Sequence, residues 1–235
     1  MANFSLEISS AVSTGWEYAK KYGLLIAVIY FVVGMVSGGL QSITGGFNMT
    51  DSQAIGEAIG RGDWESVAKL AQSTNNSIAS NFGTCIGSLI SFVVSIGLYN
   101  MALGLMSGRY TEVTFDAFKL PLAVYAKAFV VSLIVGIICI ISACFCIIPV
   151  FFVAPRLILA PVYQVDNPEA GIIESVSAAW KMTSGNTIAM LGLGVIMFCI
   201  AILGILCCCI GVYFAEAIEL FATVAAYYQL KGNLQ

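Results

Sequence analysis

The stretch CFCIIPVFFVAPRLILAP, residues 144–161, is apolar except for Arg156, which lies between two prolines. It belongs to a longer apolar region, residues 121–165, whereas one helix needs only roughly 20 residues to cross the hydrocarbon core of a bilayer. A single helix through Pro149 would exceed the thickness of any bilayer, and a proline favours a turn. The stretch therefore predicts a tight hairpin of two membrane helices, residues 121–146 and 149–165.

The composition of the whole chain also indicates a membrane protein. Of its 235 residues, 59% are hydrophobic and 10% are charged, and the mean hydropathy is +0.93, whereas soluble domains are about 25% charged. The net charge is −3 and there is no basic run, so we expect no nucleic-acid partner. The chain has no histidine, which removes the commonest general base and the commonest nitrogen ligand of metals.

Six apolar segments are candidates to cross the bilayer, two of them short. They are residues 22–40, 83–107, 121–146, 149–165, 187–208 and 211–230. The last two are separated only by CCCIG, and Gly211 favours a second hairpin. We therefore expect an all-α, polytopic membrane helix bundle of about six transmembrane helices, which forms a single integral membrane domain over residues 1–235.

The distribution of basic residues predicts the orientation, because lysine and arginine accumulate on the cytoplasmic side of a membrane. If the N-terminus is cytoplasmic, only Arg61 and Lys69 lie on the opposite side. The cytoplasmic set is Lys20, Lys21, Arg109, Lys119, Lys181 and Lys231. Both termini are then cytoplasmic. About 20 fairly polar residues precede the first apolar segment, so we expect no cleavable signal.

Two further segments are predicted to be helical without being spans of the bilayer. Residues 1–21 carry Ile8, Val12, Trp16 and Ala19 at helical spacing, which predicts an amphipathic helix in the cytoplasmic interface. Residues 41–82 form an extracytoplasmic loop with short helices near 51–59 and 64–73. Their connection, GRGD, contains the adhesion tripeptide Arg-Gly-Asp, but a turn followed by an Asp63 helix cap explains these residues better.

Residues 168–182 predict another amphipathic helix in the interface. Asn167 is the expected cap, Pro168 takes the first helical position, and Gly185 ends the helix. Ile172, Val176 and Trp180 fall on one apolar stripe. Tryptophan prefers the boundary of a bilayer, so we expect Trp16 and Trp180 to be interface anchors.

The two predicted hairpins also resemble each other. Aligning CIIPVFFVAPRL (146–157) with CCIGVYFAEAIE (208–219) places Pro149 on Gly211 and Phe152 on Phe214. Both hairpins run in the same direction, so this alignment indicates a parallel repeat.

The segments SGRYTEVTFDAF, IIPVFFVAPRLILAPVYQVDNPEAGIIESVSAAWKMTSGN and IGVYFAEAIELFATVAAYYQL resemble a bacterial family of multi-pass membrane proteins of unknown function. They are more distantly similar to the membrane domain of some glycerophosphodiester phosphodiesterases. The resemblance covers residues 105–230 and implies a core of two helical hairpins linked by the interface helix 168–182, in the bacterial inner membrane. The family has no agreed activity, so the resemblance implies an architecture only, and the missing catalytic barrel of the phosphodiesterases argues against a hydrolase.

Arg156 needs a partner or water, because a charge at the centre of a membrane helix costs about 2.5–3.5 kcal/mol. It follows Pro149 by seven residues, and Glu216 and Glu219 follow Gly211 by five and eight residues. Equivalent hairpins would place all three charges at one depth, so we expect an intramembrane cluster of Arg156, Glu216 and Glu219. A working site and a buried ion pair that fixes the helix register are both consistent with this cluster.

Five of the eight cysteines gather near the outer ends of the predicted hairpins. They are Cys144, Cys146, Cys207, Cys208 and Cys209. An oxidising compartment would permit a disulfide between the hairpin tips, but cysteine also packs well between membrane helices, and we favour packing. Their spacing is not typical of a metal site, and no cofactor is expected.

Two functions fit these observations. We expect a non-enzymatic accessory, scaffold or assembly protein, which contacts the lipid bilayer and other membrane proteins or a second copy of itself. The alternative is a small transporter or channel for a lipid or amphiphile. A dry, fully packed bundle would favour the first function, and charged residues lining a water-filled groove would favour the second.

Overall fold

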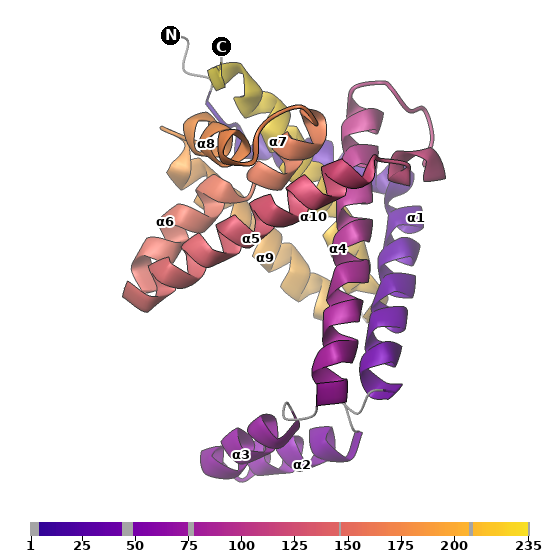
Figure 1. The fold of residues 1–235 in the computed structure, drawn as a ribbon, viewed down its shortest axis with the longest axis vertical. Coiled ribbons are helices and arrows are strands. Elements are labelled where there is room, and N and C mark those ends of the chain that lie inside the picture. Colours follow the sequence, from indigo (N-terminus) through magenta and orange to yellow (C-terminus); the bar gives the residue numbers. More distant parts are fainter. Residues whose placement is uncertain (1–4, 44–48, 75–77, 146, 207–208, 235) are drawn as a thin grey trace. The chain divides into compact units, whose positions relative to one another are not determined.

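The structure is a computed structural model that describes residues 5–43, 49–74, 78–145, 147–206 and 209–234. Every regular element in these ranges is a helix, which confirms the all-α prediction. In chain order (Figure 1) these are α1 (Ile8–Ile43), α2 (Met49–Gly60), α3 (Trp64–Thr74), α4 (Ile78–Met106), the 3-10 helix η1 (Phe115–Phe118), α5 (Leu122–Phe145), α6 (Ile147–Leu157), α7 (Ala160–Asp166), α8 (Ile172–Met182), α9 (Thr187–Leu206), α10 (Cys209–Leu230) and η2 (Lys231–Leu234).

Four helical stretches in the described part of the chain are long and apolar enough to cross a membrane. They are Ile8–Leu40, Gly83–Met106, Leu122–Cys144 and Thr187–Leu206. Many of their large hydrophobic side chains are exposed, for example Leu24 on α1, Leu133 on α5 and Leu203 on α9. Exposed apolar area on this scale is typical of a surface that contacts lipid, and it associates the chain with a membrane.

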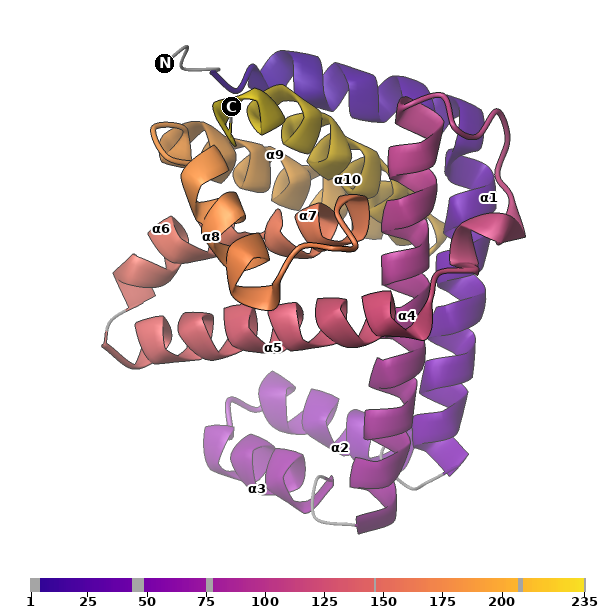
Figure 2. The same cartoon turned by 45° about the horizontal axis from the view of Figure 1, so that its top comes forward.

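The fourth predicted segment, residues 149–165, is not one helix. It is divided into α6 and α7, with the break at Ile158 and Leu159, and both pieces pack against α5 (Figure 2). Pro155 and Pro161 each remove a backbone donor next to the break. At about 1.5 Å per residue neither piece can cross the roughly 30 Å hydrocarbon core by itself. The prediction of one continuous helix here is therefore wrong.

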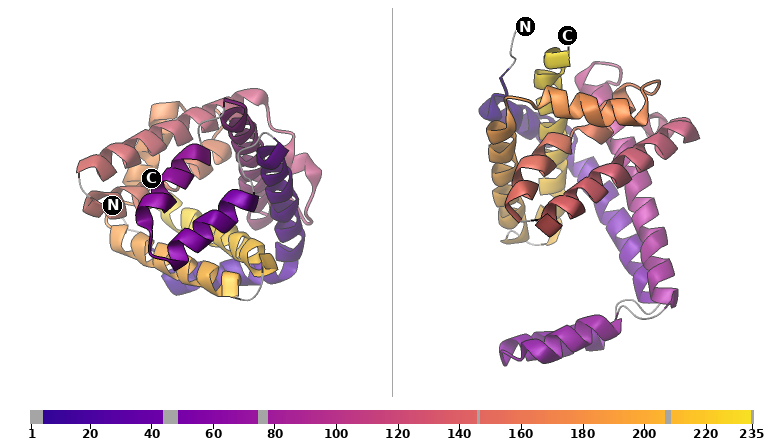
Figure 3. Two further views of the ribbon diagram at one scale, coloured as in Figure 1. Left: turned by 90° about the horizontal axis from the view of Figure 1, so that it is seen from below. Right: turned by 60° about the vertical axis from the view of Figure 1, so that its left-hand side comes forward.

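The contacts divide the chain into two compact units, residues 31–94 and the remainder, and α1 and α4 run through both units. Helix α10 has the largest run of buried residues in the described part of the larger unit, from Leu220 to Tyr227. It forms an antiparallel hairpin with α9, which is visible in the right-hand view of Figure 3. Helix α10 is not among the four apolar stretches. It carries two glutamates, and its second half is covered largely by protein.

The first part of α1 packs against α10 through small residues. Ala11, Gly15, Ala19 and Gly23 are buried at four-residue spacing, and a Cβ added at Gly15 would lie 2.9 Å from the backbone nitrogen of Ala222. Helix α1 runs without a break from Ile8 to Ile43, so the predicted amphipathic segment 1–21 is from Ile8 onward part of the same helix as the first apolar segment, and is not a separate helix. Small residues allow this close approach of two helix backbones.

The smaller unit contains the predicted pair of short helices, α2 and α3, which pack side by side (Figure 3). Gly62 has a φ of +70° in the turn, and Asp63 caps α3 by accepting hydrogen bonds from the Ser66 hydroxyl (2.6 Å) and backbone N–H (3.1 Å). These bonds lower the pKa of the Asp63 carboxyl. The prediction of a turn and a cap at GRGD is confirmed.

Helix α8 begins four residues later than predicted. Asn167 is the C-cap of α7, and the first turn of α8 is held by a 3.1 Å hydrogen bond from the Gly171 backbone N–H to Glu174 Oε2. Because successive residues advance by about 100° around a helix, the side chains of α8 divide into three sectors. The sector against the protein is Ser175, Ala178, Ala179 and Met182.

The other two sectors of α8 face away from the protein and have different chemistry. One is apolar and contains Ile172, Ile173, Val176 and Trp180, with Ile173 80% exposed and Trp180 41% exposed. The other is polar and contains Glu174, Ser177 and Lys181. The stripe predicted from the sequence is therefore left uncovered by the protein, as an interface helix requires.

Candidate functional site

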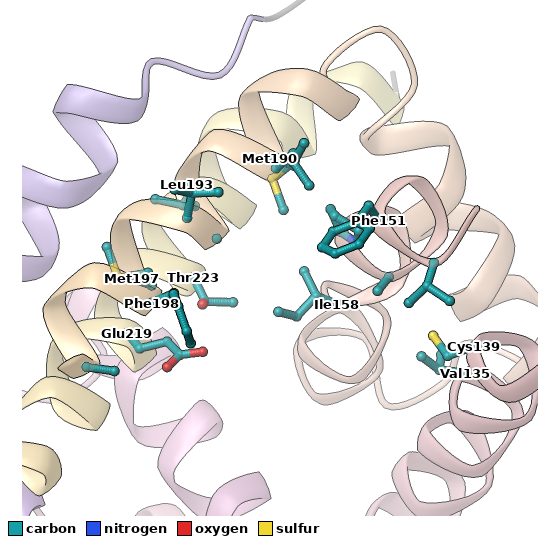
Figure 4. Close-up of a pocket in the computed structure, with 17 residues that line it drawn as sticks. Val135, Cys139, Phe151, Ile158, Met190, Leu193, Met197, Phe198, Glu219 and Thr223 are labelled. Carbon is teal, nitrogen blue, oxygen red and sulfur yellow. The ribbon is translucent and has the colours of Figure 1, made fainter. Parts of the chain in front are cut away.

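A groove of about 890 Å³ opens between the two helical hairpins (Figure 4). It is lined from α5 by Val135 and Cys139, from α6 and the break after it by Val150, Phe151, Ala154, Pro155 and Ile158, from α9 by Met190, Leu191, Leu193, Gly194, Val195, Met197, Phe198 and Ala201, and from α10 by Glu219 and Thr223. Its volume falls in the range of about 300–1,000 Å³ that is typical of ligand pockets.

The break between α6 and α7 forms part of this groove. Pro155 and Ile158 lie on its wall, whereas Leu159 is fully buried. Irregular backbone at membrane depth is tolerated where it is buried in protein or lines a cavity, and broken helices form the binding sites of many transporters. Pro155 near the end of α6 and Pro161 at the start of α7 thus accompany a break in the helix that the hydropathy of the segment did not predict.

Helix α10 supplies the polar wall of the groove. Glu219 and Thr223 are one helical turn apart and both line the groove, opposite the apolar side chains of α5 and α6 (Figure 4). Glu219 lies near the middle of the 22-residue α10. Glu216 is one turn earlier and does not line the groove. Tyr30 and Tyr99 lie within electrostatic range of Glu219.

Arg156, in the last turn of α6, contacts α8 and α9. Its guanidinium carbon lies 4.4 Å from the centre of the Trp180 ring, and its Nε donates a 2.8 Å hydrogen bond to Thr187 Oγ1. The Thr183 hydroxyl donates to the Arg156 carbonyl at 3.3 Å. The Arg156 guanidinium thus links the end of α6 to the interface helix α8 by stacking on Trp180, and to the first residue of α9 by a hydrogen bond.

The structure does not bring Arg156 to Glu216 or Glu219. None of the ion pairs among the described residues includes any of the three. Gly204 of α9 faces Gly211 of α10, so Glu219 lies level with about residue 196 of the antiparallel α9. Arg156 contacts Thr187 instead. Along α9, Thr187 lies about 13 Å from the level of residue 196, at 1.5 Å per residue. The aligned turns suggested equal depth, but the register between the hairpins differs from that alignment.

We predict that Arg156 is energetically coupled to Trp180 and not to Glu219. In a double-mutant cycle, Arg156→Met and Trp180→Leu should show a coupling of about 0.5–2 kcal/mol, because the stacked pair is partly desolvated. Arg156→Met and Glu219→Gln should be additive, since they are too far apart to share partners. The measurement is the unfolding free energy in mild detergent. Coupling to Glu219 with none to Trp180 would contradict the observed position of the guanidinium.

A second polar cluster, centred on Asp166, was not predicted from the sequence. Asp166 Oδ2 accepts hydrogen bonds from Lys231 Nζ and, at 2.7 Å, from Tyr227 Oη, and Arg109 Nη2 lies 3.9 Å from Oδ1. The Asp166 side chain is 11% exposed. The cluster joins the loop after α4, the end of α7 and the end of α10, which are far apart in the sequence.

The structure describes only some of the cysteines. Cys85, Cys139, Cys144 and Cys199 have free thiols, and Cys144 is exposed. Cys146, Cys207 and Cys208 lie outside the described residues, and Cys209 is the first residue of α10, so the alternatives of packing and a disulfide between the hairpin tips stay predictions. Cys139 lines the groove.

The predicted tryptophan anchors are both partly exposed. Trp16 of α1 is 47% exposed and packs edge-on against Phe214 of α10, with ring centres 6.0 Å apart. The Arg156 guanidinium stacks on the Trp180 ring. Each tryptophan thus presents apolar surface outward while its ring is oriented by a neighbour, which suits an indole at a bilayer boundary.

Comparison of the chain with protein-family models, with curated proteins and with solved structures found no match.

Proposed function

We propose that the chain is a non-enzymatic, multi-pass protein of the bacterial inner membrane, with both termini in the cytoplasm. The four long apolar helices and the asymmetry of basic residues support this proposal. In it, α10 crosses the bilayer as a helix covered by protein, and α6 with α7 forms a broken crossing beside α5. The apolar sector of α8 lies in the cytoplasmic interface, with Lys181 and Glu174 toward water.

The groove holds the apolar part of an amphiphile, and the protein binds or carries such a molecule. The observation that supports this most strongly is a groove of about 890 Å³ with apolar walls, a broken helix and, among its described lining residues, one carboxylate. An accessory or scaffold protein is the second candidate, and the uncovered faces of α8 and of the α2–α3 pair favour it, because they offer surfaces to partners.

The test compares substitutions at two glycines, of which one lines the groove and the other does not. A Cβ at Gly194 of α9 or at Gly136 of α5 would meet no atom within 4 Å, but only Gly194 lines the groove. We expect Gly194→Leu to fill the groove and to weaken binding of a neutral dodecyl probe by at least about tenfold, or 1.4 kcal/mol. Gly136→Leu should leave the affinity unchanged within about twofold.

Binding is measured as the saturable fraction of radiolabelled dodecyl maltoside on protein in lipid nanodiscs, with empty nanodiscs as the blank. Saturation near one probe per chain that only Gly194→Leu abolishes supports an amphiphile-binding groove. Absence of saturable binding to the wild-type protein, or equal binding by both variants, would refute this function and leave the scaffold role as the better account.

A further inference from the structure

We infer that the groove selects an amphiphile with a single positive charge, and that Glu219 is the residue that recognises this charge. The inference rests on the proposed function, since it names the class of molecule that the same groove accepts. The occupant is an alkyl amine or a quaternary ammonium compound, with its chain along the apolar wall and its head at Glu219.

The distribution of charge around the groove carries this inference. Among the lining residues that the structure describes, Glu219 is the only one with a full charge when ionised, and the described residues of α5, α6 and α9 contribute no lysine or arginine to the wall. Arg156, the cation nearest in sequence to the lining residue Pro155, is held by Trp180 and Thr187 and does not line the groove. Glu219 belongs to none of the ion pairs within the described ranges.

A carboxylate in apolar surroundings is costly unless a cation or hydrogen-bond donors offset its desolvation. A bound ammonium supplies the missing countercharge at Glu219. An anionic head would be repelled by the same carboxylate, and a neutral head would leave it without a countercharge. The groove therefore selects by charge because it contains the Glu219 carboxylate and because no described lining residue supplies a countercharge.

The surroundings of Glu219 also suit an ammonium group. Phe198 of α9 lies beside Glu219 in Figure 4, and Phe151 lines the facing wall. Aromatic rings attract alkylated ammonium groups through their negative faces, and this attraction strengthens when water is excluded. Thr223, one turn further along α10, offers a hydroxyl that can accept a hydrogen bond from a primary amine.

The experiment uses three probes with the same dodecyl chain: dodecyltrimethylammonium, dodecyl maltoside and dodecyl phosphate. Each is titrated against wild-type protein, Glu219→Gln and Glu216→Gln in nanodiscs of uncharged lipid. Glu216→Gln is the matched control, because Glu216 is one turn away on α10 but outside the groove. Binding of the maltoside shows for each variant that the protein is folded and that the groove is open.

For the wild-type protein we expect the ammonium probe to bind at least about tenfold more tightly than the maltoside, and the phosphate most weakly. Glu219→Gln should reduce the ratio of ammonium to maltoside affinity to about one, while Glu216→Gln should retain most of it. Equal affinity for all three heads in the wild-type protein, or a ratio that survives Glu219→Gln, would overturn the inference and leave the amphiphile groove intact. If no probe saturates, the proposed function and the inference both fail.

Discussion

A single methyl group added at Gly204 is expected to destabilise the α9–α10 hairpin by about 1–3 kcal/mol, whereas the same group added at Gly194 is expected to stabilise the protein slightly. A Cβ at Gly204 would lie 2.7 Å from the Gly211 carbonyl oxygen, and a Cβ at Gly211 would lie 2.5 Å from the Gly204 oxygen. Both contacts are with backbone, so the two helices must move apart, and overpacking of this kind typically costs 1–3 kcal/mol.

Gly194→Ala is the matched control, because it lies on the same helix and its Cβ would meet no atom within 4 Å. Replacing glycine by alanine within a helix is favourable by roughly 0.5–1 kcal/mol when space permits. The measurement is the unfolding free energy of each variant, determined by titration with sodium dodecyl sulfate in mixed micelles. Equal effects of the two substitutions would show that the helices do not approach closely at Gly204.

Asp166→Ala is expected to lower the free energy of unfolding by about 2–3 kcal/mol. The substitution removes the acceptor of hydrogen bonds from Lys231 and Tyr227, and hydrogen bonds to a charged group contribute about 1.5–3 kcal/mol. Lys231 and Arg109 are about half exposed, and solvent therefore screens their part of the interaction. The phenol of Tyr227, whose side chain is buried, loses its acceptor without gaining water in exchange.

The control for this prediction is Glu169→Ala, three residues further along the chain. Glu169 is exposed and belongs to none of the ion pairs in the described part of the chain, so its loss should change stability by less than about 0.5 kcal/mol. A thermal melt in mild detergent compares the two variants. If they are equally stable, the Asp166 cluster does not hold the ends of α7 and α10 together.

Hydropathy predicted the four uniformly apolar helices well, because a helix that contacts lipid on much of its surface must be apolar on every side that lipid reaches. It failed at residues 149–165, where the segment of α6 and α7 is broken and the break lies against α5 and the groove. The predicted segment 211–230 does form one helix, α10, although it carries Glu216 and Glu219.

The sequence predicted individual residues of the site but not their arrangement. Arg156 and Glu219 are conspicuous as charges in apolar sequence, but their separation depends on the register between two hairpins, which no local pattern encodes. The same holds for Asp166, whose partners Arg109 and Lys231 come from distant segments. The groove itself is defined by side chains of four helical segments, most of them apolar residues with no individual signature.

The most direct test of an amphiphile-binding groove is to find where a bound alkyl chain lies. A dodecyl amine with a terminal diazirine is photoactivated on the protein in nanodiscs, and the labelled residues are mapped by mass spectrometry. The structure predicts labels at groove residues such as Phe151, Ile158 and Met197, with competition by unlabelled dodecyltrimethylammonium. Labels distributed over exposed positions of α1 such as Leu24 and Val32, and insensitive to the competitor, would contradict the account.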